Sequence, residues 1–187
     1  MELVQQTDEN LVLLFQKGNN EAFETLVLRY KNSLYQYIVS LVRDEATAGD
    51  LFQEMFIAFF KRPQAYQPNG KFKAWLFVSA RNRILNFLRD QKQLLSLDAE
   101  NEDENVSLND TLADDTPLPL EELEKEDTLS RLQAAIKQLP LRQQEIVNLR
   151  QEFSFQEIAE LTHRPLGTVL ADGHRAIKKL QQLLSEQ

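Results

Sequence analysis

The sequence predicts an all-α protein made of two small helical domains joined by an acidic flexible linker. Apolar residues recur at the 3.6-residue spacing of amphipathic helices through most of the chain. No segment alternates apolar and polar residues with period two, and clusters of Val, Ile and Thr are absent. Acidic residues concentrate in one segment without aromatic residues, which is typical of a linker. We therefore expect domains at residues 1–90 and 128–187, joined by residues 91–127.

The first domain is expected to contain four helices and one loop. Thr7 and Asp44 are suitable N-caps, and Gly18 ends the first helix. A loop from Arg62 to Gly70, with two prolines and a glycine, separates the last two helices. The four helices are expected at about residues 7–18, 19–41, 44–61 and 71–89.

The second domain is expected to contain four shorter helices, at about residues 129–139, 142–150, 155–162 and 168–184. Ser154 and Glu157 have the spacing of a capping box at the start of the third. Gly173 falls inside the last helical pattern, near its buried side, where it should cost about 1 kcal/mol relative to alanine.

Composition excludes several classes of protein. The chain has 187 residues, no cysteine and two histidines, so disulfides and a Cys- or His-built metal site are not expected. No P-loop, glycine-rich phosphate turn or nucleophile–base arrangement is present, so we expect no catalytic residues, cofactor or metal. No apolar run approaches the about 20 residues that span a bilayer, and the N-terminus does not resemble a signal peptide. We expect a cytoplasmic protein without membrane insertion.

Charge is distributed unevenly along the chain. The formal net charge of −8 divides into +1 for residues 1–90, −11 for 91–128 and +2 for 129–187. Within Met55–Arg89 there are seven basic residues, many aromatic residues and no Asp or Glu. Cations that follow phosphates and rings that stack on bases suit single-stranded nucleic acid. Most of these rings recur at the helical spacing of core residues. Tyr66 lies in the loop instead, and the sequence favours neither base contact nor core packing for its ring.

A short helix, a tight turn and a longer basic helix near the C-terminus form a helix-turn-helix pattern. Such a pattern reads DNA in many proteins and serves as a plain packing motif in others. Likewise, the basic residues of the first domain could form only a solvated face. The residues therefore leave both interpretations open.

Four segments together resemble one family. DLFQEMFIAFFK (50–61) and KFKAWLFVSARN (71–82) resemble the second conserved region of bacterial RNA polymerase sigma factors, most closely the extracytoplasmic-function, or group IV, type. LPLRQQEIVNLR (139–150) and SFQEIAELTHRPLGTVLADGHRAIKKL (154–180) resemble their fourth region. The resemblance covers about 80% of the chain, in the order of the family.

The resemblance implies a protein that directs RNA polymerase to promoters and has no catalytic activity of its own. Its implied partners are promoter DNA and the polymerase core, at the coiled-coil clamp of the largest subunit. The clamp would bind Asp50, Gln53 and Glu54. Whether an anti-sigma factor also binds is left open. The alternative is a stand-alone helix-turn-helix regulator that does not depend on polymerase docking.

The family also implies two DNA contacts. The loop and the helix after it would capture flipped bases of the −10 element, through Gln64, Tyr66, Gln67, Asn69, Lys71, Lys73, Arg81, Asn82, Arg83 and Arg89. The last helix would read the −35 element, through Arg164, Thr168, Leu170, Ala171, Asp172, His174, Arg175 and Lys178.

The chain departs from the family in its last helix. It has Ala171-Asp172 where Ser-Arg is usual, and Gly173 where a larger apolar residue is usual. Asp172 is expected to lie near the DNA groove, where its carboxylate would oppose phosphate or accept a hydrogen bond from cytosine. The third possibility is that it pairs with Arg175, three residues on.

Overall fold

The computed structural model describes residues 2–95 and 127–185 and consists of helices and connecting segments. The chain divides into two compact units, Met1–Asn101 and Glu102–Gln187, which we describe separately. The prediction of an all-α fold is confirmed, since the described residues form helices and no strand. None of the described helices is both long and apolar enough to cross a membrane.

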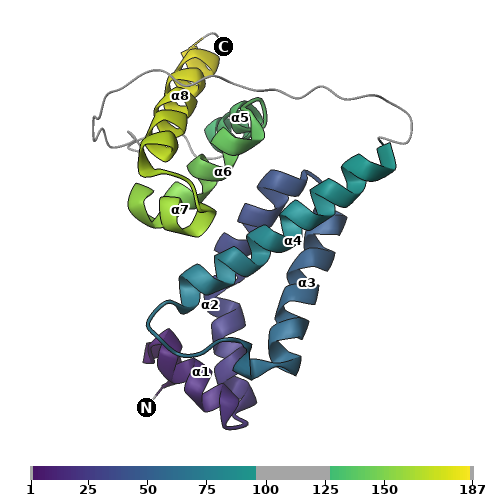
Figure 1. Ribbon diagram of the computed structural model, residues 1–187, viewed down its shortest axis with the longest axis vertical. Coiled ribbons are helices and arrows are strands. Elements are labelled where there is room, and N and C mark those ends of the chain that lie inside the picture. The colour runs from purple at the N-terminus through teal and green to yellow at the C-terminus, as the bar shows by residue number, and fades with distance from the viewer. Residues whose placement is uncertain (1, 96–126, 186–187) are drawn as a thin grey trace. The chain divides into compact units, whose positions relative to one another are not determined.

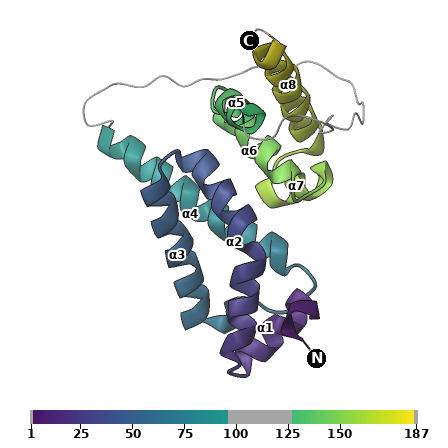
Figure 2. The ribbon, with the colours of Figure 1, turned by 180° about the vertical axis from the view of Figure 1, so that it is seen from behind.

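Three long helices form the body of the first unit, with a short helix against one end. Helix α4 lies across α2 and α3, and α1 packs on α2 beside the loop that leads into α4 (Figures 1 and 2). The helices are α1 (Asp8–Gln16), α2 (Asn20–Val42), α3 (Glu45–Lys61) and α4 (Phe72–Leu95), with the 3-10 turns η1 (Leu3–Gln5) and η2 (Pro63–Ala65).

Local side-chain caps start the first three of these helices. The side-chain oxygens of Thr7, Asn19 and Asp44 each accept a hydrogen bond from a backbone N–H three residues later, at 3.3, 3.1 and 2.8 Å. Such bonds satisfy N–H groups that have no partner within the helix. The predicted caps Thr7 and Asp44 are confirmed. Gly18 has a φ of 96°, a left-handed conformation that favours glycine at the end of α1.

Aromatic rings make up much of the core of the first unit. The buried ring of Phe59 in α3 lies 5.4 Å from that of Phe15 in α1, and 5.6 and 5.3 Å from those of Phe72 and Trp75 in α4. Three helices thus meet around one ring. The expectation that most aromatic rings of Met55–Arg89 belong to the core is confirmed.

Helix α4 is longer than expected. It continues to Leu95, whereas its expected end is near Arg89 and residues 91–95 are expected to belong to the linker. Gln91 and Lys92 are good helix formers, and no proline or glycine interrupts the turn. The acidic residues expected to form the rest of the linker lie almost wholly outside the described residues.

The second unit contains α5 (Asp127–Ile136), α6 (Leu141–Arg150), α7 (Phe155–Thr162) and α8 (Leu166–Ser185). Helix α8 contacts the other three, and its buried Ala176 and Leu180 pack with Ala135 and Leu139. The capping box at Ser154 is confirmed, because Ser154 N donates to Glu157 Oε2 at 2.8 Å and Glu157 N donates to Ser154 Oγ at 3.3 Å. Helix α8 begins two residues before the predicted Thr168.

Candidate nucleic-acid interface

The loop between α3 and α4 is built around a buried tyrosine. The ring of Tyr66 is 3% exposed and lies 5.2 Å from the ring of Phe72 and 5.3 Å from that of Trp75. The expectation that Tyr66 could stack on a captured base is therefore wrong for this structure. The turn η2 directs the ring onto the start of α4, a contact that no periodic pattern in a loop could indicate.

The hydroxyl of Tyr66 organises the rest of the loop. It donates a hydrogen bond to Glu9 Oε1 at 2.6 Å and accepts one from the backbone N–H of Lys71 at 3.1 Å. Asn69 Oδ1 lies 3.0 Å from the same hydroxyl and also accepts from Lys71 N, at 3.2 Å. Burial and the bond to Glu9 raise the pKa of Tyr66 above its usual value, so the phenol stays protonated as a donor.

Four predicted loop residues are exposed: Gln64, Gln67, Asn69 and Lys71. Their amide and ammonium groups can contact base edges and phosphates, so the structure leaves these candidates available. Glu9 and Gln16, which hold the loop, were not found by the sequence analysis. They are 47 to 63 residues away from their partners, and no local spacing connects residues so far apart.

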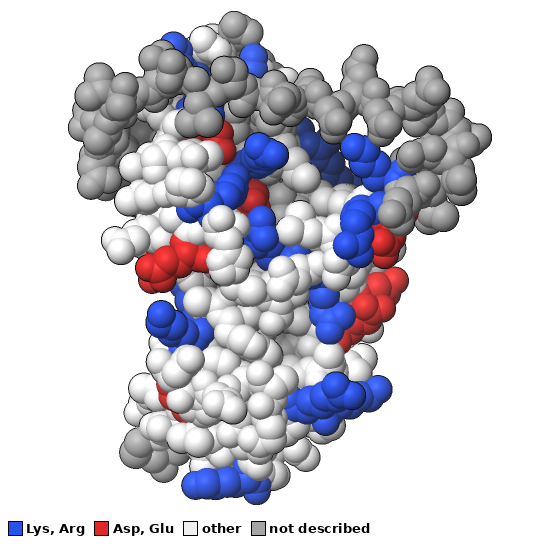
Figure 3. Space-filling model, in the orientation of Figure 1, with Lys and Arg blue, Asp and Glu red and all other residues white. Residues whose placement is uncertain are grey.

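The remaining −10 candidates lie along α4. Asn82 and Arg89 are exposed, while Lys73, Arg81 and Arg83 are partly buried. Arg83 lies 3.8 Å from Glu54 of α3, and Arg89 lies 3.5 Å from Asp90. Figure 3 shows Lys and Arg groups distributed over one view of the molecule, with uncharged and acidic surface between them. The role of these α4 residues as phosphate contacts stays a prediction.

The candidates for polymerase docking lie together on α3. Asp50, Gln53 and Glu54 are exposed, away from the buried side of the helix that carries Met55 and Phe59. Exposure on one helix makes them accessible to a partner. Their assignment stays a prediction.

In the second unit, Asp172 does not face outward. It is 8% exposed, and its Oδ1 accepts from Arg175 Nη2 at 2.6 Å. Its Oδ2 lies 3.6 Å from Nη1 of Arg164. The expectation that this carboxylate lies near the groove, to oppose phosphate or select a base, is therefore wrong. The third possibility, a pair with Arg175, is confirmed.

Arg164 was expected to contact the DNA backbone and is instead turned into the unit. Its side chain is 17% exposed, and Nη2 donates to the buried carboxylate of Glu145 at 2.8 Å. A guanidinium between two carboxylates compensates both charges where water is excluded. Arg164 thus joins α6 to α8, and the charge that it carries is not available to phosphate.

The outer face of α8 retains most of the predicted −35 candidates. His174, Arg175 and Lys178 are exposed, and Thr168, Leu170 and Ala171 are half-buried. Arg175 has a side chain that is 52% exposed while one nitrogen is held by Asp172. A guanidinium anchored at one nitrogen keeps further N–H donors for a guanine edge or a phosphate.

Two family models match the chain. The model described as Sigma-70 region 2 matches residues 26–93, and the model described as Sigma-70, region 4 matches residues 129–180. The first match includes α3, the loop and most of α4, and excludes α1. The second includes α6, α7 and most of α8.

Several curated proteins are similar over almost their whole length. The chain is 30% identical over 191 residues to the RNA polymerase sigma-H factor of Pseudomonas aeruginosa, covering 98% of this chain and 99% of that protein. It is 30% identical over 186 residues to the ECF RNA polymerase sigma-E factor of Haemophilus influenzae, covering 95% of each. It is 29% identical over 173 residues to the ECF RNA polymerase sigma factor SigW of Bacillus subtilis, covering 91% and 92%.

Two solved structures have the same fold. The sigma factor RpoE from Bartonella quintana, solved with the anti-sigma factor NepR, has a TM-score of 0.66 at 23% identity and covers 87% of this chain and 96% of its own. CnrH, solved with the cytosolic domain of CnrY, has a TM-score of 0.66 at 22% identity and covers 96% and 98%. At these identities the likeness concerns the fold.

Proposed function

This chain belongs to the extracytoplasmic-function sigma factors of bacterial RNA polymerase, and we propose that its two units read the two promoter elements separately. A sigma factor directs the polymerase in promoter recognition and transcription initiation. The observation that carries this function is that both sigma-70 regions occur in one chain, in the order of its relatives and over almost their full length. A stand-alone regulator that does not depend on polymerase would not need the first region.

We propose that residues 1–90 act at the −10 element. The exposed amides of Gln64, Gln67 and Asn69 would make hydrogen bonds to the edges of flipped bases, and Lys71 would contact a phosphate. The basic residues of α4 would follow the backbone of the separated strand. Because the ring of Tyr66 is buried, its proposed role is to shape the loop and not to stack on a base.

Residues 128–187 are proposed to read the −35 element, with α8 in the major groove. Arg175 is the best candidate for a guanine edge, because a guanidinium can donate two parallel hydrogen bonds to guanine. His174 and Lys178 lie exposed on the same helix and would contact the backbone or a base edge. Asp172 and Arg164 would act only indirectly, by holding Arg175 and the start of α8.

Docking on the polymerase is proposed to let both units contact the promoter at the same time. Asp50, Gln53 and Glu54 would bind the clamp of the largest subunit. Residues 96–126 would connect the two units, and a second binding site that is connected through a long segment has a low effective concentration. We therefore expect weak promoter binding by the free chain and strong binding by the holoenzyme.

Further partners follow by analogy. The sigma factor RpoE of Bartonella quintana was solved with an anti-sigma factor, and we propose that a protein of that class also regulates this chain. We assign the chain no catalytic activity, since its relatives are named as sigma factors. Its place of action would be the cytoplasm, where polymerase and chromosome are found.

The experiment is transcription in vitro from a library of randomised promoters, with purified core polymerase and this chain. The expected result is a set of transcripts whose templates share two motifs at a constant spacing, and only when both proteins are present. Footprinting of the selected promoter by the free chain is the control. A footprint as strong without core as with it would support the stand-alone regulator instead.

A further inference from the structure

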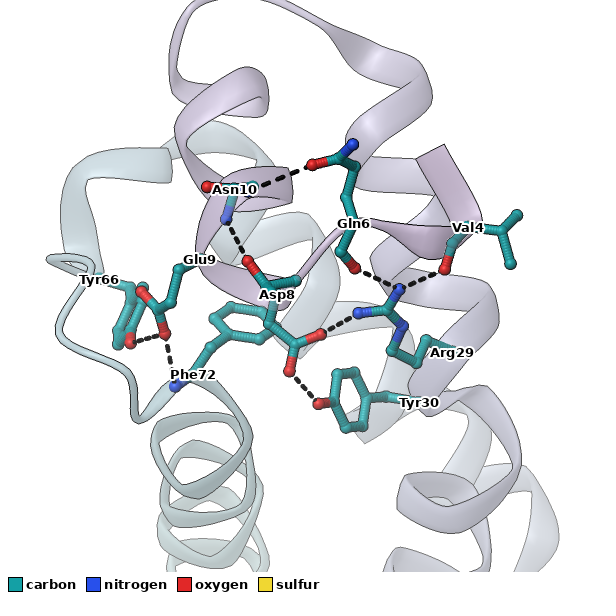
Figure 4. Close-up of polar contacts among 10 residues, drawn as sticks. Val4, Gln6, Asp8, Glu9, Asn10, Arg29, Tyr30, Tyr66 and Phe72 are labelled. Atoms are coloured by element: carbon teal, nitrogen blue, oxygen red, sulfur yellow. Dashed lines mark hydrogen bonds and ion pairs between the residues drawn. The ribbon is translucent and has the colours of Figure 1, made fainter. Parts of the chain in front are cut away.

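Helix α1 binds both ends of the loop between α3 and α4, which is the loop proposed to capture bases of the −10 element. Gln16 Nε2 donates to the backbone carbonyls of Pro63 and Tyr66, at 2.8 and 2.9 Å. Glu9 Oε1 accepts from the hydroxyl of Tyr66 at 2.6 Å and from the backbone N–H of Phe72 at 3.2 Å (Figure 4). Glu9 and Gln16 are seven residues apart, about two helical turns, so both lie on the same side of α1.

The carboxylate of Glu9 acts as a cap at the start of α4, because it accepts from the backbone N–H of Phe72. Lys71 precedes the first residue of α4, and its side chain has no acceptor for the free N–H groups of the first turn. Gly70, with a φ of 79°, turns the chain into the helix. The carboxylate of Glu9 supplies the acceptor from a different helix, and its negative charge is favourable at a helix N-terminus.

The two neighbouring carboxylates of α1 contact different parts of the unit. Asp8 points to α2, where it accepts from Arg29 and from the hydroxyl of Tyr30, while Glu9 points to the loop (Figure 4). Asp8 therefore attaches α1 to the body of the unit. Glu9 connects α1 to the segment proposed to capture bases.

The buried carboxylate of Glu9 also has an energetic cost. Its Oε2 is buried and has no hydrogen-bond partner among the described residues. A buried carboxylate oxygen without a partner destabilises the fold. The same carboxylate holds the hydroxyl of Tyr66 and the start of α4, beside the exposed residues Gln64, Gln67 and Asn69.

We infer that Glu9, through Tyr66, is a positioning residue for base capture, assisted by Gln16. The inference rests on the proposed role of the loop at the −10 element. A loop that is ordered before binding loses less conformational entropy when it takes up a base, so single-strand affinity rises without a direct contact from Glu9. Since α1 lies outside the matched residues 26–93, this function is assigned to a part of the chain that the family model does not include.

The test compares holoenzymes that carry wild-type chain, Glu9→Ala, Glu9→Gln or Tyr66→Phe. Three affinities are measured: for core polymerase, for the duplex −35 region, and for a single-stranded non-template oligonucleotide with the −10 sequence selected from the library. We expect Glu9→Ala to lose about tenfold in the third affinity alone, because unrestrained loop side chains must be ordered on binding. Glu9→Gln retains an acceptor oxygen and should recover most of the loss.

Asp8→Asn is the matched control, because Asp8 is the adjacent carboxylate and contacts α2 instead of the loop. It should lower the melting temperature without changing single-strand affinity at temperatures where the protein is folded. Equal losses from Asp8→Asn and Glu9→Ala, or parallel losses in core affinity, would overturn the inference and leave Glu9 a structural residue.

Two further outcomes are distinguishable. If Glu9→Ala does not fold, Tyr66→Phe is the variant that tests the inference, because it keeps the packed ring and removes the bond to Glu9. Unchanged single-strand affinity of Tyr66→Phe would overturn the inference. If the wild-type holoenzyme does not bind the single strand at all, the proposed role of the loop fails, and the positioning inference fails with it. The −35 affinity measured in parallel then shows whether the holoenzyme itself is active.

Discussion

The ring of Phe155 occupies the space that a side chain at position 173 would need. A Cβ added to Gly173 would lie 2.8 Å from Cε1 and 3.2 Å from Cζ of Phe155. Phe155 is the first residue of α7 and Gly173 lies in the middle of α8, so this contact sets how closely the two helices of the helix-turn-helix approach. A side chain at position 173 would therefore need the Phe155 ring to move.

Gly173→Ala should therefore destabilise the second unit, by about 1–3 kcal/mol, because overpacking outweighs the higher helix propensity of alanine. This reverses the sign expected from propensity alone. The measurement is urea unfolding followed by circular dichroism.

Gly49→Ala is the control for helix propensity, since Gly49 lies inside α3 with nothing within 4 Å of an added Cβ. It should stabilise the first unit by about 0.5–1 kcal/mol. Trp75 is the single tryptophan and its fluorescence reports that unit. A further check is the double variant Gly173→Ala/Phe155→Leu, in which the smaller side chain at position 155 should restore part of the lost stability. Additive losses from the two substitutions would mean that the two residues do not compete for space.

Asp172→Arg should unfold the second unit more readily, by about 3 kcal/mol, because it places a third cation beside Arg164 and Arg175 and removes their carboxylate. Thermal melting of the full chain is the measurement, and Asp172→Asn is the milder comparison. A stable Asp172→Arg variant with tighter promoter binding would show that the residue faces DNA after all.

Arg175→Lys should weaken selection at one position of the −35 element by about 1–3 kcal/mol, because an ammonium lacks the rigid planar fork with which a guanidinium donates two parallel hydrogen bonds to guanine. The positive charge is retained, so the salt dependence of holoenzyme binding should stay nearly constant. Lys178→Gln is the complementary variant: it should reduce the salt slope by about one counterion and leave base preference intact. Both quantities come from competition binding at several salt concentrations, and an unchanged base preference in Arg175→Lys would assign Arg175 to phosphate instead of guanine.

The stability of the first unit should fall at alkaline pH through Tyr66. Its pKa is raised in the folded chain by burial and by the bond to Glu9, so the neutral phenol is favoured by folding. That contribution is complete below the ordinary pKa of about 10 and is lost as pH rises through the raised value. The stability difference between wild type and Tyr66→Phe should therefore shrink above about pH 10, as measured by Trp75 fluorescence during urea unfolding. A difference that is independent of pH would mean that Tyr66 ionises freely.

The sequence by itself determined the helical class of the protein and most helix starts. Thr7, Asp44 and Ser154 each bond to a backbone group three residues away, so cap and helix are visible in the same short window. Where local signals were weak the boundaries were missed, as at the end of α4, which continues to Leu95. The family resemblance, too, depended on residues close together in the sequence.

Only the tertiary structure decided what the unusual residues do. Tyr66 is joined to Glu9 across 57 positions, and Arg164 to Glu145 across 19, so neither bond follows from spacing along the chain. By helix propensity alone Gly173 destabilises α8, whereas the ring of Phe155 beside it leaves no space for a side chain. The physical reason is that hydrogen bonding within a helix turn is local, whereas burial, charge pairing and steric contact depend on which helix faces pack together.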